Sequence, residues 1–132
     1  MKIVVVGAGY VGLSNAILLA ERHPVTLLDI EQSRIDLIAA GRSPIVDQEV
    51  EAALASGDLR LTPTTSAEQA LAGADLVVVA TPTDYDSATN LFDTSSVESV
   101  IAEALAAEPH VLVVIKSTIP VGFVERLRTR HP

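Results

Sequence analysis

The stretch KIVVVGAGYVGLSNAILLAER, residues 2–22, decides the fold of this chain. Residues 2–6 end in an unbroken run of β-branched residues, as expected for a central strand buried on both faces of a parallel sheet. Three glycines follow at a spacing that suits a tight turn, and residues 10–22 are predicted to form a helix. The stretch therefore predicts a strand, a turn and a helix in immediate succession.

The rest of the chain alternates between the same two kinds of element. We predict further strands at residues 25–29, 59–62, 75–80 and 111–115. Helices are expected at residues 31–40, 47–56, 65–72 and 121–130, and from a capping box at residues 95–98. Asp47 is placed to cap the second of these, and residues 65–68 form another capping box.

Strands separated by helices imply parallel pairing with right-handed crossovers. The fold class is therefore α/β, a doubly wound parallel sheet of the Rossmann type with strand order 3-2-1-4-5. It stops before the sixth strand of a full dinucleotide-binding fold, so residues 1–132 are expected to be one domain of a longer protein. The unpaired fifth strand is then predicted to recruit a second copy, or to be covered by the last helix.

Composition excludes several classes of protein. Hydrophobic residues make up 48% of the 132 positions, which excludes disorder, and the absence of cysteine excludes disulfides, a Cys-based zinc site and a Cys nucleophile within this segment. The net charge of −8 and the 3% of aromatic residues argue against a nucleic-acid partner. The three histidines have no metal-ligand or triad spacing, so no metal site is predicted.

The uncharged residues 3–20 approach the length of a membrane span and follow a lysine, as in a signal peptide. However, this run contains three glycines together with Ser14 and Asn15, and it lacks a convincing cleavage site. It is interpreted as the buried strand, turn and helix described above. Neither a membrane segment nor a secretory signal is predicted, and a cytoplasmic location is expected.

Gly7, Gly9 and Gly12 form a GxGxxG motif that follows a predicted strand and opens a predicted helix. In that context the first glycine permits the tight turn, the second lets a pyrophosphate approach the backbone, and the third lets helix and strand pack closely. The helix N-terminus then offers free N–H groups to the phosphates. The alternative is a glycine-rich turn without a ligand, and flavin enzymes share the motif.

Asp29 ends the second predicted strand, where a carboxylate can accept hydrogen bonds from ribose hydroxyls and would repel a 2′-phosphate. It therefore favours NAD over NADP, although it could also cap the following helix. Arg34 lies one turn into that helix, where it either reaches the adenine and ribose or is solvated.

Two further loops follow strands and should lie at the same edge of the sheet. Thr81-Pro82-Thr83 and residues 117–122, STIPVG, supply hydroxyls beside a rigid proline. These hydroxyls suit a ribose or a carboxamide, but Thr118 could equally cap the last helix. Lys116 is interpreted as solvated or ion-paired, and residues 84–93 as a polar loop long enough to be a lid or a binding loop.

With these residues in place, the chain resembles the N-terminal NAD-binding domain of UDP-glucose 6-dehydrogenases, in the UDP-glucose/GDP-mannose dehydrogenase family. The resemblance spans almost the whole chain, and its most specific parts are ATPTDYD at residues 80–86 and IKSTIPVGF at residues 115–123. The other matching stretches are MKIVVVGAGYVGLSNA, TLLDI, GRSPIVDQEV and NLFDTSSVESVI. Members of this family oxidise C6 of a nucleotide sugar twice, using two NAD.

The resemblance implies a role for each motif residue. The cofactor pyrophosphate would be lined by Gly7, Gly9, Tyr10, Val11 and Gly12. Asp29 and Arg34 would hold the adenosine end, and Thr83 and Thr118 would contact the cofactor nearer the reaction. Thr118 would also be catalytic, by positioning a water or an oxygen at the reacting centre.

The family's catalytic cysteine, its assisting residues and its UDP pocket would all lie beyond this chain. The expected partner is therefore a nucleotide sugar bound through the missing C-terminal region, and the chain alone is expected to bind NAD without turnover. The parent enzyme could instead act on GDP-mannose or UDP-N-acetylmannosamine. A non-catalytic NAD-sensing module would carry the same glycines and acid, but would not need the STIPVG segment.

Overall fold

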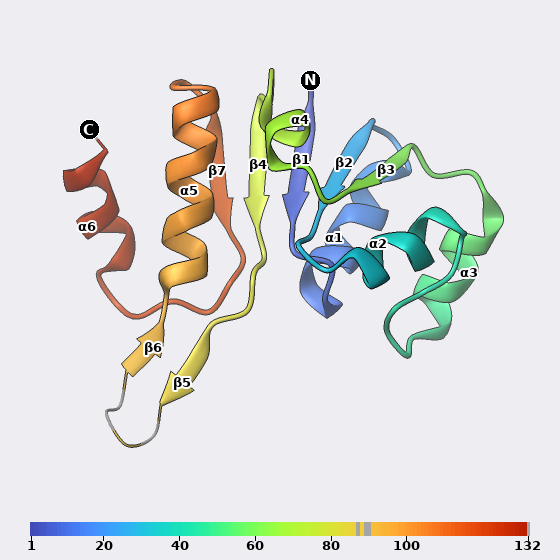
Figure 1. Cartoon of the computed structure of the whole chain (residues 1–132), viewed down its shortest axis with the longest axis horizontal. Helices are drawn as coiled ribbons and strands as arrows, with labels where there is room; N and C mark the ends of the chain where they lie inside the picture. Colours follow the sequence, from blue (N-terminus) through green and yellow to red (C-terminus); the bar gives the residue numbers. More distant parts are fainter. Residues whose placement is uncertain (87, 89–90, 132) are drawn as a thin grey trace.

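A five-stranded parallel sheet forms the centre of the molecule in the computed structural model, which describes residues 1–86, 88 and 91–131. The strand order is β3-β2-β1-β4-β7, with every neighbouring pair parallel, so the predicted doubly wound order is confirmed (Figure 1). The strands are β1 (Ile3–Val6), β2 (Val25–Leu28), β3 (Leu61–Thr64), β4 (Leu76–Val79) and β7 (Leu112–Ile115).

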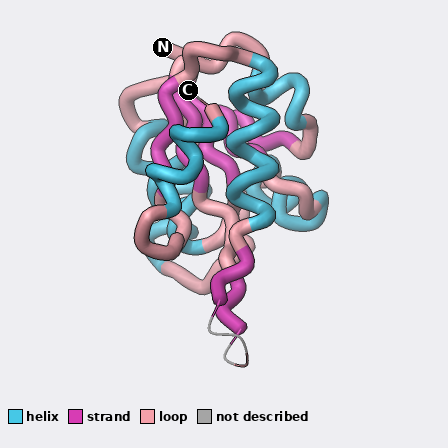
Figure 2. Tube along the Cα trace, turned by 90° about the vertical axis from the view of Figure 1, so that its left-hand side faces the viewer, coloured by secondary structure: helices cyan, strands magenta, loops and turns pink. Residues whose placement is uncertain are grey.

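Helices cover both faces of this sheet (Figure 2). They are α1 (Tyr10–Ala20), α2 (Gln32–Ala39), α3 (Gln48–Ser56), α4 (Ala67–Leu71), α5 (Ser95–Ala107) and α6 (Phe123–Arg130). Because side chains alternate along a strand, β1 sends Ile3 and Val5 to one face and Val4 and Val6 to the other. The all-apolar strand predicted from the sequence is thus buried on both sides.

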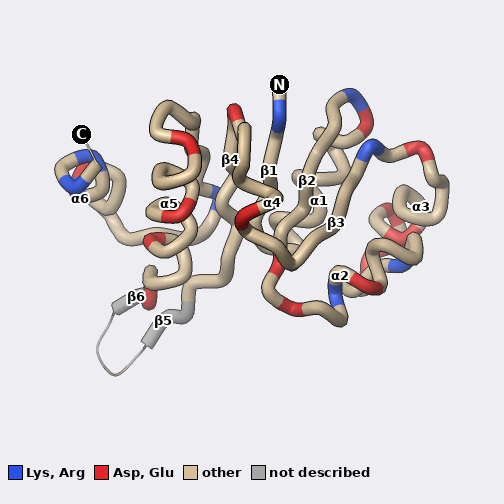
Figure 3. The backbone as a smooth tube through the Cα atoms, turned by 45° about the horizontal axis from the view of Figure 1, so that its top comes forward, with Lys and Arg blue, Asp and Glu red and all other residues tan. Residues whose placement is uncertain are grey.

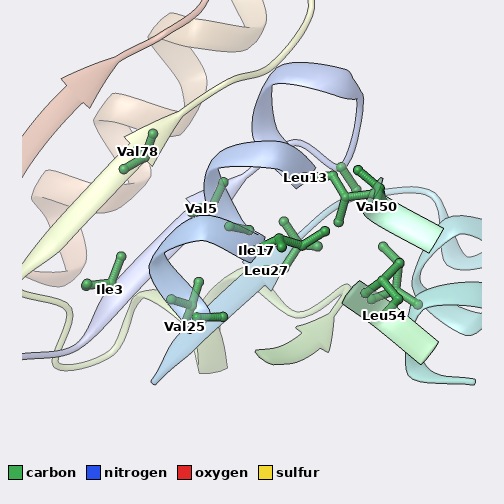
Figure 4. Close-up of a cluster of buried hydrophobic side chains, with 13 residues drawn as sticks. Ile3, Val5, Leu13, Ile17, Val25, Leu27, Val50, Leu54 and Val78 are labelled. Carbon is green, nitrogen blue, oxygen red and sulfur yellow. The ribbon is translucent and has the colours of Figure 1, made fainter. Parts of the chain in front are cut away.

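The two faces carry separate hydrophobic clusters. On one face α1 and α3 pack against β1 and β2 through side chains that include Leu13, Ile17, Leu27 and Leu54 (Figure 4). On the other face α4, α5 and α6 pack against β1 and β4. Burial of this much aliphatic surface, at about 25 cal/mol per Å², is the main force that holds the layers together.

The third strand begins two residues later than predicted, at Leu61 instead of Leu59. Its position follows from pairing with β2, in which Leu61 lies opposite Val25 and Thr64 opposite Leu28. Pro63 is tolerated inside the strand because β3 lies at the edge of the sheet, where no further strand needs its missing N–H group.

Helix capping agrees with the sequence at α3 but not at α5. Asp47 caps α3 as predicted, because its Oδ1 accepts hydrogen bonds from the N–H groups of Glu49 and Val50. Helix α4 is capped by Ser66, which accepts from the Gln69 N–H, one residue later than the predicted box. At α5 the predicted Ser95 cap is wrong.

The N-cap residue of α5 is Thr94, which makes no side-chain cap, and the carboxylate of Asp93 contacts Ser95, the first residue of the helix. Its Oδ1 accepts from both the hydroxyl and the backbone N–H of Ser95, at 2.6 and 3.0 Å. These two hydrogen bonds lower the pKa of Asp93 from its ordinary value, and the one from the Ser95 hydroxyl has the larger effect. An ionised carboxylate is a strong acceptor, and it here satisfies the first backbone N–H group of the helix.

The segment after β4 is a hairpin instead of the irregular loop expected from its polar composition. Strands β5 (Asp84–Asp86) and β6 (Leu91–Asp93) pair antiparallel, with Tyr85 opposite Phe92. In Figure 1 the hairpin extends beyond the carboxyl ends of the central strands. Residues 87 and 89–90 of the proposed lid lie outside the described residues. A role as a lid stays a prediction.

Helix α6 packs beside α5 and leaves one face of β7 uncovered. Its Phe123 and Leu127 are buried in the same cluster as α5, and Arg130 pairs with Glu98 of α5 at 2.7 Å. Figure 3 shows basic residues on α6 as well as at separate places elsewhere in the chain. On the opposite face of β7, Leu112 is 64% exposed and Val114 38% exposed.

None of the helices in the described part of the chain combines the length and the apolar character that crossing a bilayer requires.

Candidate functional site

Two cavities lie at the carboxyl ends of the parallel strands, where an open α/β sheet binds its ligands. The first has a volume of about 370 Å³ and the second of about 360 Å³. They meet at a junction whose lining both cavities share, namely Gly7, Asp29, Arg34, Thr81 and Pro82. Together the two cavities form one continuous candidate site beside the glycine turn.

Each glycine of the motif lacks a side chain for a different structural reason. Gly7 has a φ of 107°, and a Cβ there would lie 2.6 Å from the carbonyl oxygen of Ala80. A Cβ on Gly12 would overlap the carbonyl oxygen of Gly7, so this position is closed by packing. A Cβ on Gly9 would meet nothing within 4 Å, and Gly9 lines the first cavity. Packing therefore does not require glycine at position 9, and the missing side chain leaves room for a ligand.

The N-terminus of α1 faces the first cavity through Gly9, Tyr10 and Val11. Gly9 is the N-cap residue and makes no side-chain cap, and the first turn carries no acidic residue. The first N–H groups of the helix are thus not capped by a side chain of the helix itself, and the nearest carboxylate, Asp29, accepts from the Ala8 N–H just before the N-cap. Tyr10 and Val11 are 60% and 50% exposed, in keeping with a surface that is open to a ligand.

Asp29 lies just beyond β2 and is the one buried polar or charged residue among those described, with 7% of its surface exposed. Its Oδ2 accepts from the N–H of Ala8 at 2.7 Å, and its Oδ1 accepts from the N–H of Glu31 at 2.8 Å. The suggested helix-cap role is therefore partly present, although Glu31 is the N-cap of α2. Each oxygen keeps a further lone pair for a ribose hydroxyl.

Arg34 lies at the junction, one turn into α2. Its Nη1 is 3.6 Å from Oδ2 of Asp29, and its Nε is 3.2 Å from Oε2 of Glu31. The side chain is 40% exposed, ion-paired, and lines both cavities. Contact with the adenine and ribose stays a prediction.

Apolar side chains line much of the second cavity. Val6 and Leu28 form part of its floor, and Val100 of α5 contributes from the other side. Ala67 and the exposed Ile30 add to this lining. Such a surface suits a flat, weakly polar group like a nucleobase.

The loop of residues 81–83 is held by two serines. Ser117 donates from its hydroxyl to the carbonyl oxygen of Thr81 at 2.6 Å, and Ser96 donates to that of Pro82 at 2.9 Å. These contacts fix the loop between the end of β7 and the start of α5. Sequence reasoning missed Ser96 as a positioning residue, because its partner lies 14 residues away and no local motif signals the contact.

Thr83, Lys116 and Thr118 line the far part of the first cavity. The suggestion that Thr118 caps the last helix is wrong, because α6 begins at Phe123 and its N-cap residue is Gly122. The hydroxyl-bearing residues of the two loops are thereby brought to one wall of the cavity, as expected from their places after β4 and β7.

Nearly all of the predicted site residues line this site. The first cavity is lined by Gly7, Gly9, Tyr10, Val11, Asp29, Arg34, Thr83 and Thr118, whereas Gly12 is buried behind the turn. Sequence reasoning did not single out Ala8 or Glu31, whose roles depend on contacts with Asp29 and Arg34. Among the described residues no group of three or more His, Asp or Glu side chains is placed to hold a metal.

Comparison with known proteins gives this site its context. Residues 1–131 match the model of the NAD-binding domain of the UDP-glucose/GDP-mannose dehydrogenase family. The UDP-glucose 6-dehydrogenase of Campylobacter jejuni is 41% identical over 98% of this chain and 34% of its own length. That of Streptococcus pneumoniae is 38% identical over 98% of the chain and 33% of its own length.

A solved structure shows the same relationship. The GDP-mannose dehydrogenase of Pseudomonas aeruginosa, crystallised as a ternary complex, superposes with a TM-score of 0.87 at 32% identity, over 99% of this chain and 31% of that one. The chain thus spans about a third of the length of the curated relatives it matches. By family model, sequence and fold together, the chain belongs to the UDP-glucose/GDP-mannose dehydrogenase family, as its NAD-binding domain.

Proposed function

We propose that this domain serves a UDP-glucose 6-dehydrogenase, which oxidises UDP-glucose to UDP-glucuronate with two NAD. The observation that carries the proposal is the identity of 41% and 38%, across almost the whole chain, to two relatives of that name. A cytoplasmic location, where NAD is available, is part of the same proposal.

The residues of the site fit NAD in three parts. The pyrophosphate would lie over Gly9, where a Cβ would meet nothing within 4 Å, and over the N-terminus of α1, which has no side-chain cap. The adenosine ribose would lie at the junction against Asp29 and Arg34, and the adenine in the second, apolar-lined cavity. The nicotinamide end would extend toward Thr83 and Thr118. When bound, NAD supplies the hydride acceptor.

The chain's own contribution to the chemistry is mainly one of position. Holding reactants in the correct geometry supplies a large part of an enzymatic rate enhancement. Thr118 offers a hydroxyl that can orient a water or a substrate oxygen, but a hydroxyl is too weak a base to remove a proton unaided. The Ser117 and Ser96 contacts keep the neighbouring loop of residues 81–83 in place.

We further propose that the 132 residues bind NAD without turning over a nucleotide sugar. They contain no cysteine, so a covalent thioester cannot form within them. The relatives are about three times as long, and the sugar nucleotide would be held by the part that this chain does not match. The parent enzyme could still act on GDP-mannose or UDP-N-acetylmannosamine, whose recognition would depend on that part.

Two measurements test the proposal. Titration calorimetry of the chain should show binding of NAD, and a mixture with NAD and UDP-glucose should give no NADH absorbance above a protein-free control. Steady NADH production that persists through further purification would contradict the absence of turnover.

A further test uses a chimera, in which these residues replace the matching third of the Campylobacter jejuni relative. Turnover of UDP-glucose by the chimera would support a catalytic cofactor domain. A folded, NAD-binding chimera without turnover would favour the NAD-sensing alternative.

A further inference from the structure

The junction between the two cavities carries one residue type that favours NAD and one that favours NADP. An acid at the end of the second strand is typical of NAD sites, whereas an arginine nearby accommodates the 2′-phosphate of NADP. Asp29 and Arg34 occupy these two roles in the same chain and line the same junction. The preference for NAD therefore depends on how fully the charge of Arg34 is neutralised.

Asp29 neutralises Arg34 only in part. Its Oδ2 already accepts from Ala8, its Oδ1 accepts from Glu31, and the closest approach to the guanidinium is 3.6 Å. The side chain of Glu31 is closer, with Oε2 at 3.2 Å from Nε, one turn away on α2. Glu31 is also 55% exposed and lines the second cavity beside the arginine.

We propose that Glu31 is a specificity-determining residue that keeps this domain selective for NAD by pairing with Arg34. The inference rests on the proposed placement of the adenosine ribose at the junction. A 2′-phosphate brings up to two negative charges to that place. It would meet the carboxylate of Asp29 and an arginine whose charge is already engaged by Glu31. NAD carries only a hydroxyl there and is little affected by the pair.

Glu31→Gln is the test, because it removes the charge and keeps the size of the side chain. Dissociation constants for NAD and NADP are measured by titration calorimetry at low ionic strength. The variant is expected to bind NADP about fivefold more tightly, the scale of one exposed ion pair, and NAD within about twofold of the unsubstituted chain. High salt should reduce the gain in NADP affinity, because exposed charges are screened.

Glu103→Gln is the matched control. Glu103 is an exposed acid that lines the same cavity from α5 and makes no ion pair with Arg34. The substitution removes one negative charge from the same cavity but leaves the pair of Glu31 with Arg34 intact. It should therefore leave the ratio of the NAD and NADP affinities nearly unchanged. An equal gain in both variants would overturn the proposal in favour of a general effect of cavity charge.

The double variant Glu31→Gln, Arg34→Ala separates the pair from the carboxylate alone. If Glu31 acts through Arg34, the gain in NADP affinity disappears once the arginine is absent. Persistence of the gain in the arginine-free background would overturn the proposal, and so would an unchanged ratio in Glu31→Gln while NAD still binds. If the unsubstituted chain does not bind NAD at all, the proposed function fails as well. If it binds NAD but the ratio does not respond to Glu31→Gln, only the present inference fails.

Discussion

Oδ2 of Asp29 accepts a hydrogen bond of 2.7 Å from the backbone N–H of Ala8, which lies 21 residues earlier in the chain. This hydrogen bond ties the end of β2 to the middle of the glycine turn between β1 and α1. The residue that would meet the ribose therefore also shapes the turn that would receive the pyrophosphate. Two parts of the proposed cofactor site are thus joined through one side chain.

Asp29→Ala should weaken NAD binding by roughly 1–3 kcal/mol, the scale of hydrogen bonds lost from a charged group. The loss should include a contribution from a less ordered glycine turn, because Ala8 loses its acceptor. Calorimetry with both cofactors measures the effect, and Asp58→Ala, at an exposed position outside both cavities, is the control. Equal or tighter binding of NADP by the unsubstituted chain would contradict the role given to Asp29.

Alanine at Gly9 and at Gly12 should have different effects. Gly9→Ala should fold with nearly the same melting temperature, because φ is −80° and a Cβ there meets nothing. It should weaken NAD binding by roughly tenfold, since its methyl group would occupy the path of the pyrophosphate. Gly12→Ala should lower the melting temperature strongly, because its Cβ would overlap the Gly7 carbonyl. Similar stability losses in both variants would refute this distinction.

Thr118→Ala should lower the turnover rate of the chimera more than it weakens NAD binding. The reason is that a hydroxyl at the end of the cavity would orient an oxygen at the reacting centre. Thr118→Ser keeps the hydroxyl and should restore most of the rate. A loss confined to NAD affinity would make Thr118 a cofactor contact without a catalytic role.

The start of α5 should become less stable in acid. The pKa of Asp93 is lowered in the folded state by its hydrogen bonds with Ser95, so the carboxylate stabilises the folded form above its ordinary pKa. That contribution is lost as pH falls through the lowered folded pKa. Amide exchange of the first turn of α5, compared between the unsubstituted chain and Asp93→Ala, checks this. The difference should vanish at low pH, and a constant difference would contradict it.

The exposed face of β7 should favour self-association. Leu112 and Val114 are exposed there, and β7 lies at the edge of the sheet, with α6 packed on the other face. Light scattering should show a mass that rises with concentration, and Val114→Lys should lower it because a charge opposes edge pairing. A strict monomer at high concentration, with fast amide exchange along β7, would refute the pairing.

The order of strands and helices could be predicted from the sequence because its signals are local. The run of residues 3–6 and the glycines after it specify a buried strand, a turn and a helix within one short stretch. Strands that alternate with helices then leave little choice of topology. The same local logic placed Thr83 and Thr118 beside the glycine turn, because the carboxyl ends of parallel strands share one edge.

Only the tertiary structure determined the contacts that complete the site. The hydrogen bond of Asp29 with Ala8 and the contact of Ser117 with Thr81 join residues 21 and 36 positions apart. No local pattern reports such contacts, because they depend on which loops the sheet brings together. The position of β3 was set by its partner β2, and the first residue of α5, Ser95, is held by the carboxylate of Asp93 instead of acting as the cap itself. Local propensity determined which segments form strands and helices, and pairing and packing across the sheet determined which residues contact one another.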